Sequence, residues 1–150
     1  MYSIVALQES DIADMYQAVQ QSQTSLEELG WIAQADWNLF HRHYTAIIQQ
    51  KKLHIFAIRV DGKFAGSVEI GDRADHYVIG YWLGVQYRGQ GIATEAIKSV
   101  LSKFDQKPIM ADTLLTNVPS SRLLEKLGFE LERTNDTNKF YKFAQDKLTH

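Results

Sequence analysis

The sequence of 150 residues contains no cysteine, and this absence removes several classes of protein at once. Without cysteine there is no disulfide framework, no thiolate metal site and no cysteine nucleophile to carry a covalent acyl group. Disulfide-rich secreted domains are excluded, and a reducing, cytoplasmic location is expected. Proline and glycine are also sparse, at two and nine residues, which excludes a low-complexity or collagen-like chain.

Long hydrophobic runs are missing as well. The longest stretch without a charged or strongly polar side chain runs from Tyr77 to Val85, nine residues, whereas a membrane-spanning helix needs about 20. The N-terminus lacks the basic residues and the apolar segment of a signal peptide. We therefore expect a protein that does not enter the membrane and that forms one domain over residues 1–150.

Basic residues are absent from the first 41 positions, which hold six acids. From Arg42 onward sixteen bases stand against twelve acids, so a net charge of −2 conceals two halves of opposite sign. Neither half contains a basic cluster, which argues against nucleic-acid binding.

The hydrophobic pattern predicts a mixture of strands and helices. The Asp61-Gly62 pair between two β-rich runs indicates a hairpin with a type I′ turn. Asp11 is expected to cap a helix, and Gly128 to end one. The order of elements predicts an α+β (mixed α/β) fold in which strands 77–85 and 109–115 form a right-handed parallel crossover. Strands are expected at 3–8, 53–60, 63–70, 77–85, 109–115, 129–133 and 140–143, and helices at 11–21, 25–29, 36–50, 89–104 and 119–127.

The densest local motif is Gln86-Tyr87-Arg88-Gly89-Gln90-Gly91, which follows the apolar strand and opens a helix. Its two glycines let main-chain N–H groups point at one place, and the helix start adds partial positive charge, which suits a phosphate or pyrophosphate. Arg88 could add a full charge. The phosphate loop of nucleotide hydrolases is excluded because Ile92-Ala93 follows Gly91. An ordinary strand-to-helix turn is the alternative.

Two motifs in order make the sequence similar to a known superfamily. One is Gly80-Tyr81-Trp82-Leu83 with Gln86-x-x-Gly89-x-Gly91-Ile92-Ala93-Thr94-Glu95-Ala96, and the other runs from Asn117-Val118-Pro119-Ser120 to Gly128-Phe129. Together they resemble the GNAT superfamily of acyl-CoA-dependent N-acetyltransferases, and within it the ribosomal-protein N-acetyltransferase branch. The segment from Ser25 to Trp31 also looks like the acceptor-side loop of that branch.

This resemblance implies a twisted, mostly antiparallel sheet with a splayed parallel strand pair and helices on both faces. Acetyl-CoA would lie in the gap between the splayed strands, and a main-chain N–H near Leu83 would polarise the thioester carbonyl. Asn117 would reach the cofactor arm, although it could equally cap a helix. The residues implied in cofactor binding are Leu83, Val85, Arg88, Gly89, Gln90, Gly91, Ile92, Ala93, Thr94 and Asn117.

The resemblance also implies catalytic residues. Ser120 would place its hydroxyl against the departing sulfur, and Leu124 stands where many members carry a tyrosine. Glu69 is our candidate for the general base, with His76 and Tyr77 behind it, because Val78 occupies the position of the usual carboxylate. The alternative is that Glu69 is an exposed acid on a half-solvated strand. Trp31, Trp37, Glu69 and Tyr81 are candidates for the acceptor site, although aromatic residues at such spacing often belong to a core.

The leading interpretation is direct acetyl transfer from acetyl-CoA to a primary amine in a ternary complex, without a metal. Deprotonating an α-amine of pKa ~7.8 at pH 7 costs about 1.1 kcal/mol, against about 4.6 kcal/mol for a lysine, which favours a peptide N-terminus. The alternatives are a polyamine or other small amine, and a non-catalytic acyl-CoA-binding module. The acidic N-terminal segment would attract a cationic acceptor and the basic remainder an anionic donor. A monomer or homodimer is compatible with the sequence.

Overall fold

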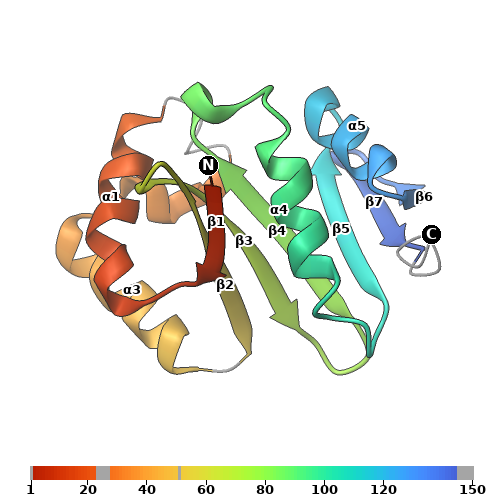
Figure 1. Cartoon of the computed structure of the whole chain (residues 1–150). Coiled ribbons are helices and arrows are strands. Elements are labelled where there is room, and N and C mark those ends of the chain that lie inside the picture. The colour runs from red at the N-terminus through yellow and green to blue at the C-terminus, as the bar shows by residue number, and fades with distance from the viewer. Residues whose placement is uncertain (1, 23–27, 51, 145–150) are drawn as a thin grey trace.

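The computed structural model describes residues 2–22, 28–50 and 52–144. Their strands form one sheet of seven in the order β1-β2-β3-β4-β5-β7-β6, so that the last two strands in the chain exchange places at the edge (Figure 1). The strands are β1 (Tyr2–Ala6), β2 (Leu53–Val60), β3 (Lys63–Asp72), β4 (Tyr77–Leu83), β5 (Ile109–Leu114), β6 (Phe129–Thr134) and β7 (Asn138–Phe143). The helices are α1 (Ile12–Gln21), α3 (Trp37–Gln49), α4 (Ile92–Leu101) and α5 (Val118–Lys126).

The hairpin between β2 and β3 confirms the strongest turn signal in the sequence. Asp61 and Gly62 both have positive φ, 49° and 81°, and Val60 pairs with Lys63 across the turn. Positive φ at both central residues is the geometry of a type I′ turn, whose twist matches the flanking strands. The prediction of a mixed α+β fold is also confirmed, because every neighbouring strand pair is antiparallel except β4 and β5.

The parallel pair of β4 and β5 is short. Tyr77 pairs with Ile109 and Val78 with Met110, and no later residues of the two strands pair. Figure 1 shows the strands diverging from this end, with α4 crossing in front of them. The predicted crossover is therefore confirmed, and the remainder of β4, from Ile79 to Leu83, has a main-chain edge that β5 does not occupy.

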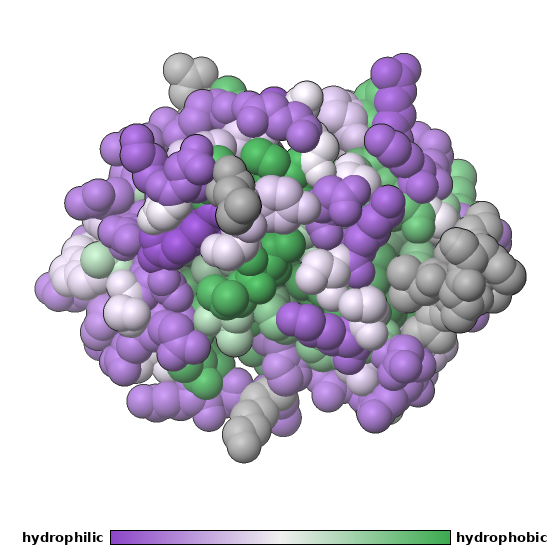
Figure 2. Space-filling model, in the orientation of Figure 1, coloured by the Kyte–Doolittle hydropathy of each residue, from purple (hydrophilic) through white to green (hydrophobic). Residues whose placement is uncertain are grey.

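Two hydrophobic cores lie on the two sides of the sheet. One contains Met15 and Phe40, from α1 and α3, with Ile55 and Trp82 from the sheet. The other packs α4 and α5 against side chains that include Val68 and Ile79. Helix α4 covers only part of this face of the sheet. Hydrophobic side chains therefore reach the surface near the centre of the view in Figure 2, and polar side chains surround them.

Several expected boundaries are wrong by a few residues. Strand β4 ends at Leu83, and Val85–Tyr87 form a 3₁₀ turn instead of continuing it. Helix α4 begins at Ile92 and ends at Leu101, since Gly89 and Gly91 both adopt positive φ and cannot continue a right-handed helix. Gly128 ends α5 with φ 104°, as predicted. The expected helix at 25–29 lies mostly outside the described residues.

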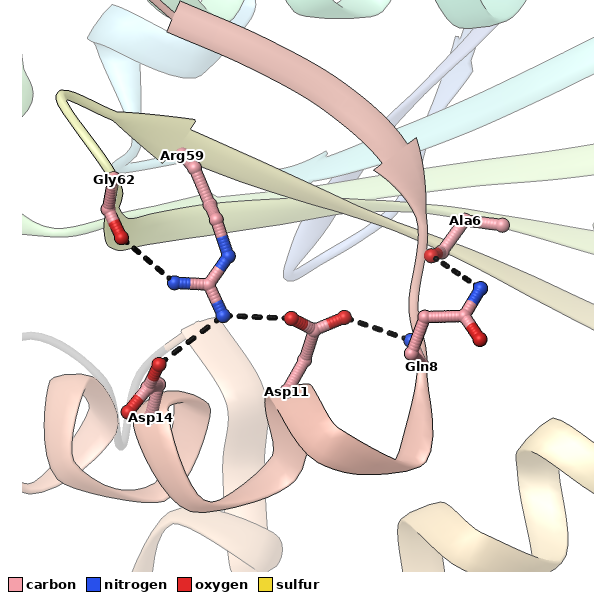
Figure 3. A network of polar contacts seen from close by, with 6 residues as sticks. All are labelled: Ala6, Gln8, Asp11, Asp14, Arg59 and Gly62. Carbon is pink, nitrogen blue, oxygen red and sulfur yellow. Dashed lines mark hydrogen bonds and ion pairs between the residues drawn. The ribbon is translucent and has the colours of Figure 1, made fainter.

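Asp11 does not cap α1 as predicted, because its carboxylate has other partners. It accepts a hydrogen bond from the Gln8 N–H at 2.8 Å and pairs with Arg59 at 2.6 Å. The same guanidinium reaches Asp14 at 3.1 Å and the Gly62 carbonyl at 2.9 Å (Figure 3). This Arg59 network ties the start of α1 to the β2–β3 hairpin. The Asp11 hydrogen bond is the main reason why the pKa of Arg59 is raised.

None of the described helices is both long enough and apolar enough to cross a membrane.

Candidate active site

The turn between β4 and α4 has the geometry that an anion needs. Gly89 and Gly91 have φ of 76° and 79°, and a Cβ built on either would meet no atom within 4 Å, so their surface is open. Gly91 immediately precedes a helix of ten residues, whose first N–H groups lack partners within the helix. An extended, anionic ligand can therefore approach this backbone closely.

The side chain of Arg88 is turned back from this turn. Its Nε donates to the Leu83 carbonyl oxygen at 3.0 Å, and its terminal nitrogen forms an ion pair with Glu28. Sequence reasoning placed the Arg88 charge on a phosphate. In the structure the guanidinium instead joins the end of β4 to the segment that precedes α3.

The main chain of Leu83 faces the gap between β4 and β5. The Gly84 N–H donates to the Ala65 carbonyl at 2.8 Å, and hydrogen-bonded positions alternate along an antiparallel ladder. Gly84 and Trp82 therefore turn their N–H groups towards β3, while those of Leu83 and Tyr81 point to the other side. There β5 has already separated, so the Leu83 N–H is directed towards the place where a ligand between the strands would lie.

At the opposite side of this gap, α5 presents Ser120. Asn117 caps the helix, its side-chain oxygen accepting from the Ser120 N–H at 3.2 Å, which confirms the helix-capping alternative. The Ser120 hydroxyl is hydrogen-bonded to the Tyr81 hydroxyl across the gap. Burial raises the pKa of Tyr81, partly offset by this hydrogen bond, so that the phenol stays protonated at neutral pH. Two hydroxyl groups thus meet where the sequence indicated one.

Glu69 lies on the other face of the sheet, in a cavity of about 160 Å³. The cavity is also lined by Glu28, Trp31, His43, Tyr44 and four aliphatic side chains. Among the described residues the Glu69 carboxylate has no hydrogen-bond or ion-pair partner. Burial raises its pKa above the ordinary carboxylate value. Burial also lowers the pKa of His43, whose imidazole therefore stays neutral near pH 7. The lining of the cavity thus includes two acidic side chains and no lysine or arginine.

Gly80 separates this cavity from the gap. It stands directly opposite Glu69 in the β3–β4 register, so both positions point to the same face of the sheet. A Cβ built on Gly80 would meet no atom within 4 Å. Position 80 therefore places no side chain between the carboxylate and the edge of β4 that β5 leaves uncovered.

The remaining candidates divide into those near the cavity and those away from it. Trp31 lines the cavity, packing edge to face on His43, although it is 60% exposed. Trp37 contacts Tyr16 and His41 instead and does not line the cavity. His76 lies in the β3–β4 turn beside Asp75, at the far end of the strand from Leu83, so the structure does not bring it to the site.

The other cofactor candidates surround the gap. Val85 is 46% exposed just after β4, Gln90 donates to the Gln86 carbonyl within the turn, and Ile92 and Thr94 are buried at the start of α4. Ala93 is partly buried against the α4 core. A larger open depression of about 730 Å³ lies on the outer face of α3, and no candidate residue lines it.

Comparison with known proteins identifies the family of the chain. The sequence model of the acetyltransferase (GNAT) domain matches residues 3–130. The chain therefore belongs to the GNAT family of acetyltransferases. A search of curated protein sequences gave no match.

Solved structures share the fold at low sequence identity. The ribosomal L7/L12 α-N-protein acetyltransferase RimL, in complex with coenzyme A, has a TM-score of 0.82 and 18% identity, over 94% of this chain and 92% of that one. A chimera of the spermidine N-acetyltransferase SpeG from Vibrio cholerae has a TM-score of 0.82 and 17% identity, covering 99% and 98%. Mycobacterium smegmatis RimJ, with a coenzyme A disulfide, has a TM-score of 0.77 and 22% identity, covering 99% and 84%.

Sequence reasoning missed two contacts of the site. Neither the Tyr81–Ser120 hydrogen bond nor the Arg88–Glu28 ion pair has a local sequence signal, because 39 and 60 residues separate the partners. Leu124 offers no hydroxyl one turn after Ser120, and the second hydroxyl of the site comes from Tyr81 in β4.

Proposed function

We propose that this protein transfers an acetyl group from acetyl-CoA directly to a primary amine, with the α-amine of a peptide N-terminus as the favoured acceptor. One observation carries the proposal. The Glu69 carboxylate, which has no partner among the described residues, lies on one face of the sheet, and the hydroxyl groups of Tyr81 and Ser120 lie on the other. Between them runs an edge of β4 that β5 leaves uncovered.

The residues around the gap fit acetyl-CoA. The Gly89–Gly91 backbone and the start of α4 can hold the pyrophosphate, and the edge of β4 at Leu83 can pair with the extended pantetheine arm. When bound, acetyl-CoA supplies the acetyl group as a thioester and a thiol as leaving group. The Leu83 N–H would donate to the thioester carbonyl oxygen as that oxygen gains negative charge, which its direction towards the gap supports.

Glu69 is the proposed general base. An ammonium acceptor must lose a proton before it can attack, and a carboxylate in the cavity takes that proton at its side-chain oxygen. The raised pKa of Glu69 makes it a stronger base than a solvated carboxylate, closer to the operating pH. As the C–S bond breaks, the Ser120 hydroxyl would donate a hydrogen bond to the departing sulfur, and the second proton lost by the amine nitrogen would reach the thiolate through solvent. The Tyr81 hydroxyl, which is protonated and hydrogen-bonded to Ser120, could take the role of the Ser120 hydroxyl. A thiol of pKa ~8.5 needs only modest help.

A polyamine or another small amine is the second candidate acceptor. Two carboxylates, Glu28 and Glu69, line a cavity of only about 160 Å³, which suits a compact cation. The similarity in fold to a spermidine N-acetyltransferase is compatible with this alternative.

The test is a single-turnover incubation of the protein with acetyl-CoA and a panel of N-terminal peptides, lysine peptides and small amines. We expect CoA release above the hydrolysis background, fastest with one acceptor class. Binding of acetyl-CoA without acetylation of any amine would exclude the enzymatic proposal and leave an acyl-CoA-binding module.

A further inference from the structure

The ion pair between Arg88 and Glu28 joins the turn after β4, where a pyrophosphate would bind, to the cavity where the acceptor would bind. Arg88 is the sole lysine or arginine of the turn 84–91, where a pyrophosphate would bind. Glu28 lines the cavity on the other side of β4. The two side chains form an ion pair across 60 residues of sequence, and they are 39% and 20% exposed.

A bound pyrophosphate would compete with Glu28 for this cation. The Arg88 Nε is already directed to the Leu83 carbonyl, and the terminal nitrogen faces Glu28. Guanidinium groups bind phosphate oxygens through two parallel hydrogen bonds, so a pyrophosphate in this turn can take the place of Glu28 on the guanidinium. The main chain of Arg88 lies in the same turn, so its side chain needs only to rotate to reach an anion there.

Building on the proposed function, we propose that Glu28 is an internal competitor that couples donor binding to acceptor binding. Acetyl-CoA draws Arg88 towards its pyrophosphate, and the negative charge of Glu28 in the cavity is then no longer offset by Arg88. An ammonium acceptor consequently binds more tightly to the complex with acetyl-CoA than to the protein alone. By thermodynamic linkage, the acceptor strengthens acetyl-CoA binding by the same factor.

The coupling should be small. Ion pairs between partly exposed side chains stabilise by at most about 1 kcal/mol, so removing the competitor changes affinity by about two- to fivefold. Rising salt weakens the ion pair and reduces the difference.

Calorimetric titration with CoA tests the competition without measuring activity. The proteins are the wild type, Glu28→Gln, and Glu95→Gln as a matched control, since Glu95 is an exposed acid in the first turn of α4 that pairs with Lys98 and not with Arg88. We expect Glu28→Gln to bind CoA about two- to fivefold more tightly than the wild type at low salt, and Glu95→Gln to gain clearly less. Equal or weaker binding by Glu28→Gln overturns the coupling, as does an equal gain in both variants.

A structural readout distinguishes this failure from failure of the proposed function. The carboxyl carbon resonance of Glu28, assigned by its loss in Glu28→Gln, should shift when CoA is added to the wild type. If CoA binds and that resonance does not move, the competition is wrong and the acetyltransferase proposal is untouched. If the wild type does not bind CoA at all, both proposals fail.

Discussion

Two largely buried carboxylates on the α1–α3 side of the sheet have opposite surroundings. Asp11 is held by the Gln8 N–H and by Arg59, which also reaches Asp14 and the Gly62 carbonyl (Figure 3). Glu69 lies in a cavity with no ion-pair or hydrogen-bond partner among the described residues. Both carboxylates have left bulk water, but only the first has its desolvation offset by neighbouring donors.

The difference separates a structural carboxylate from a chemical one. A carboxylate with two fixed donors, such as Asp11, holds two elements together. A carboxylate without donors costs stability, and the raised pKa of Glu69 makes it a better proton acceptor than a solvated carboxylate. Substitutions at the two positions should therefore have opposite consequences for stability and activity.

The largest expected effect is on catalysis at Glu69. Glu69→Gln should lower kcat by about 10²–10⁴-fold, the usual contribution of a general base. In the wild type, kcat should fall as the pH drops through the raised pKa of Glu69, at a higher pH than for a solvated carboxylate. The variant should lack this acidic limb, which a pH–rate profile measures. An unchanged kcat would assign proton removal to water.

The next effect is on stability at Asp11. Asp11→Asn should lower the free energy of unfolding by about 1–3 kcal/mol, because Arg59 and the Gln8 N–H lose a charged acceptor. Asp14→Asn is the control, since Asp14 is 56% exposed and should contribute less than about 1 kcal/mol. Urea denaturation measures both, and kcat per folded molecule should stay constant. A loss of kcat without a loss of stability would show that Asp11 acts in catalysis and does not stabilise the fold.

Much of the fold could be predicted from the sequence because its signals are local. Asp61-Gly62 set the hairpin, and the apolar stripe of α4 set the helix that crosses the gap. The boundaries around the gap could not be predicted, because Gly89 and Gly91 read equally well as part of a helix start or as a turn before it. Their positive φ became visible only in three dimensions.

Less of the candidate site could be predicted from the sequence, because the site depends on which charged side chains already have partners in the fold. The acidic N-terminal segment was expected to attract the acceptor, but Asp11 and Asp14 pair with Arg59, and Asp36 caps α3 through the Leu39 N–H. Of the described acids in that segment, Glu28 alone lines the cavity. The second cavity acid, Glu69, comes from β3. Net charge along a chain does not tell which acids already have partners in the fold.

A smaller effect is expected at the two hydroxyl groups. Ser120→Ala should lower kcat by about tenfold, less than a typical general acid, because a thiolate leaves readily. Tyr81→Phe should lower it less, and the double variant should lose more than Ser120→Ala alone if Tyr81 replaces the missing hydroxyl. Ser121→Ala is the matched control. Its hydroxyl bonds Thr113 at 3.1 Å in the core, so it should affect stability and not kcat. CoA affinity, measured by calorimetry, should stay constant in Ser120→Ala and Tyr81→Phe.

The smallest expected effect is a gain of stability in the variant that loses most activity. The folded-state pKa of Glu69 is raised, so its ionisation opposes folding. The wild type keeps its full stability below the unfolded pKa of about 4.3 and loses part of it as the pH rises through the folded value. Glu69→Gln cannot ionise, so urea denaturation should show equal stabilities near pH 4 and an advantage on the order of 1 kcal/mol for the variant at about pH 8. Glu95→Gln, an exposed substitution, should show no such pH-dependent gain. If Glu69→Gln is less stable at both pH values, the cavity supplies donors to the carboxylate, and the contrast with Asp11 disappears.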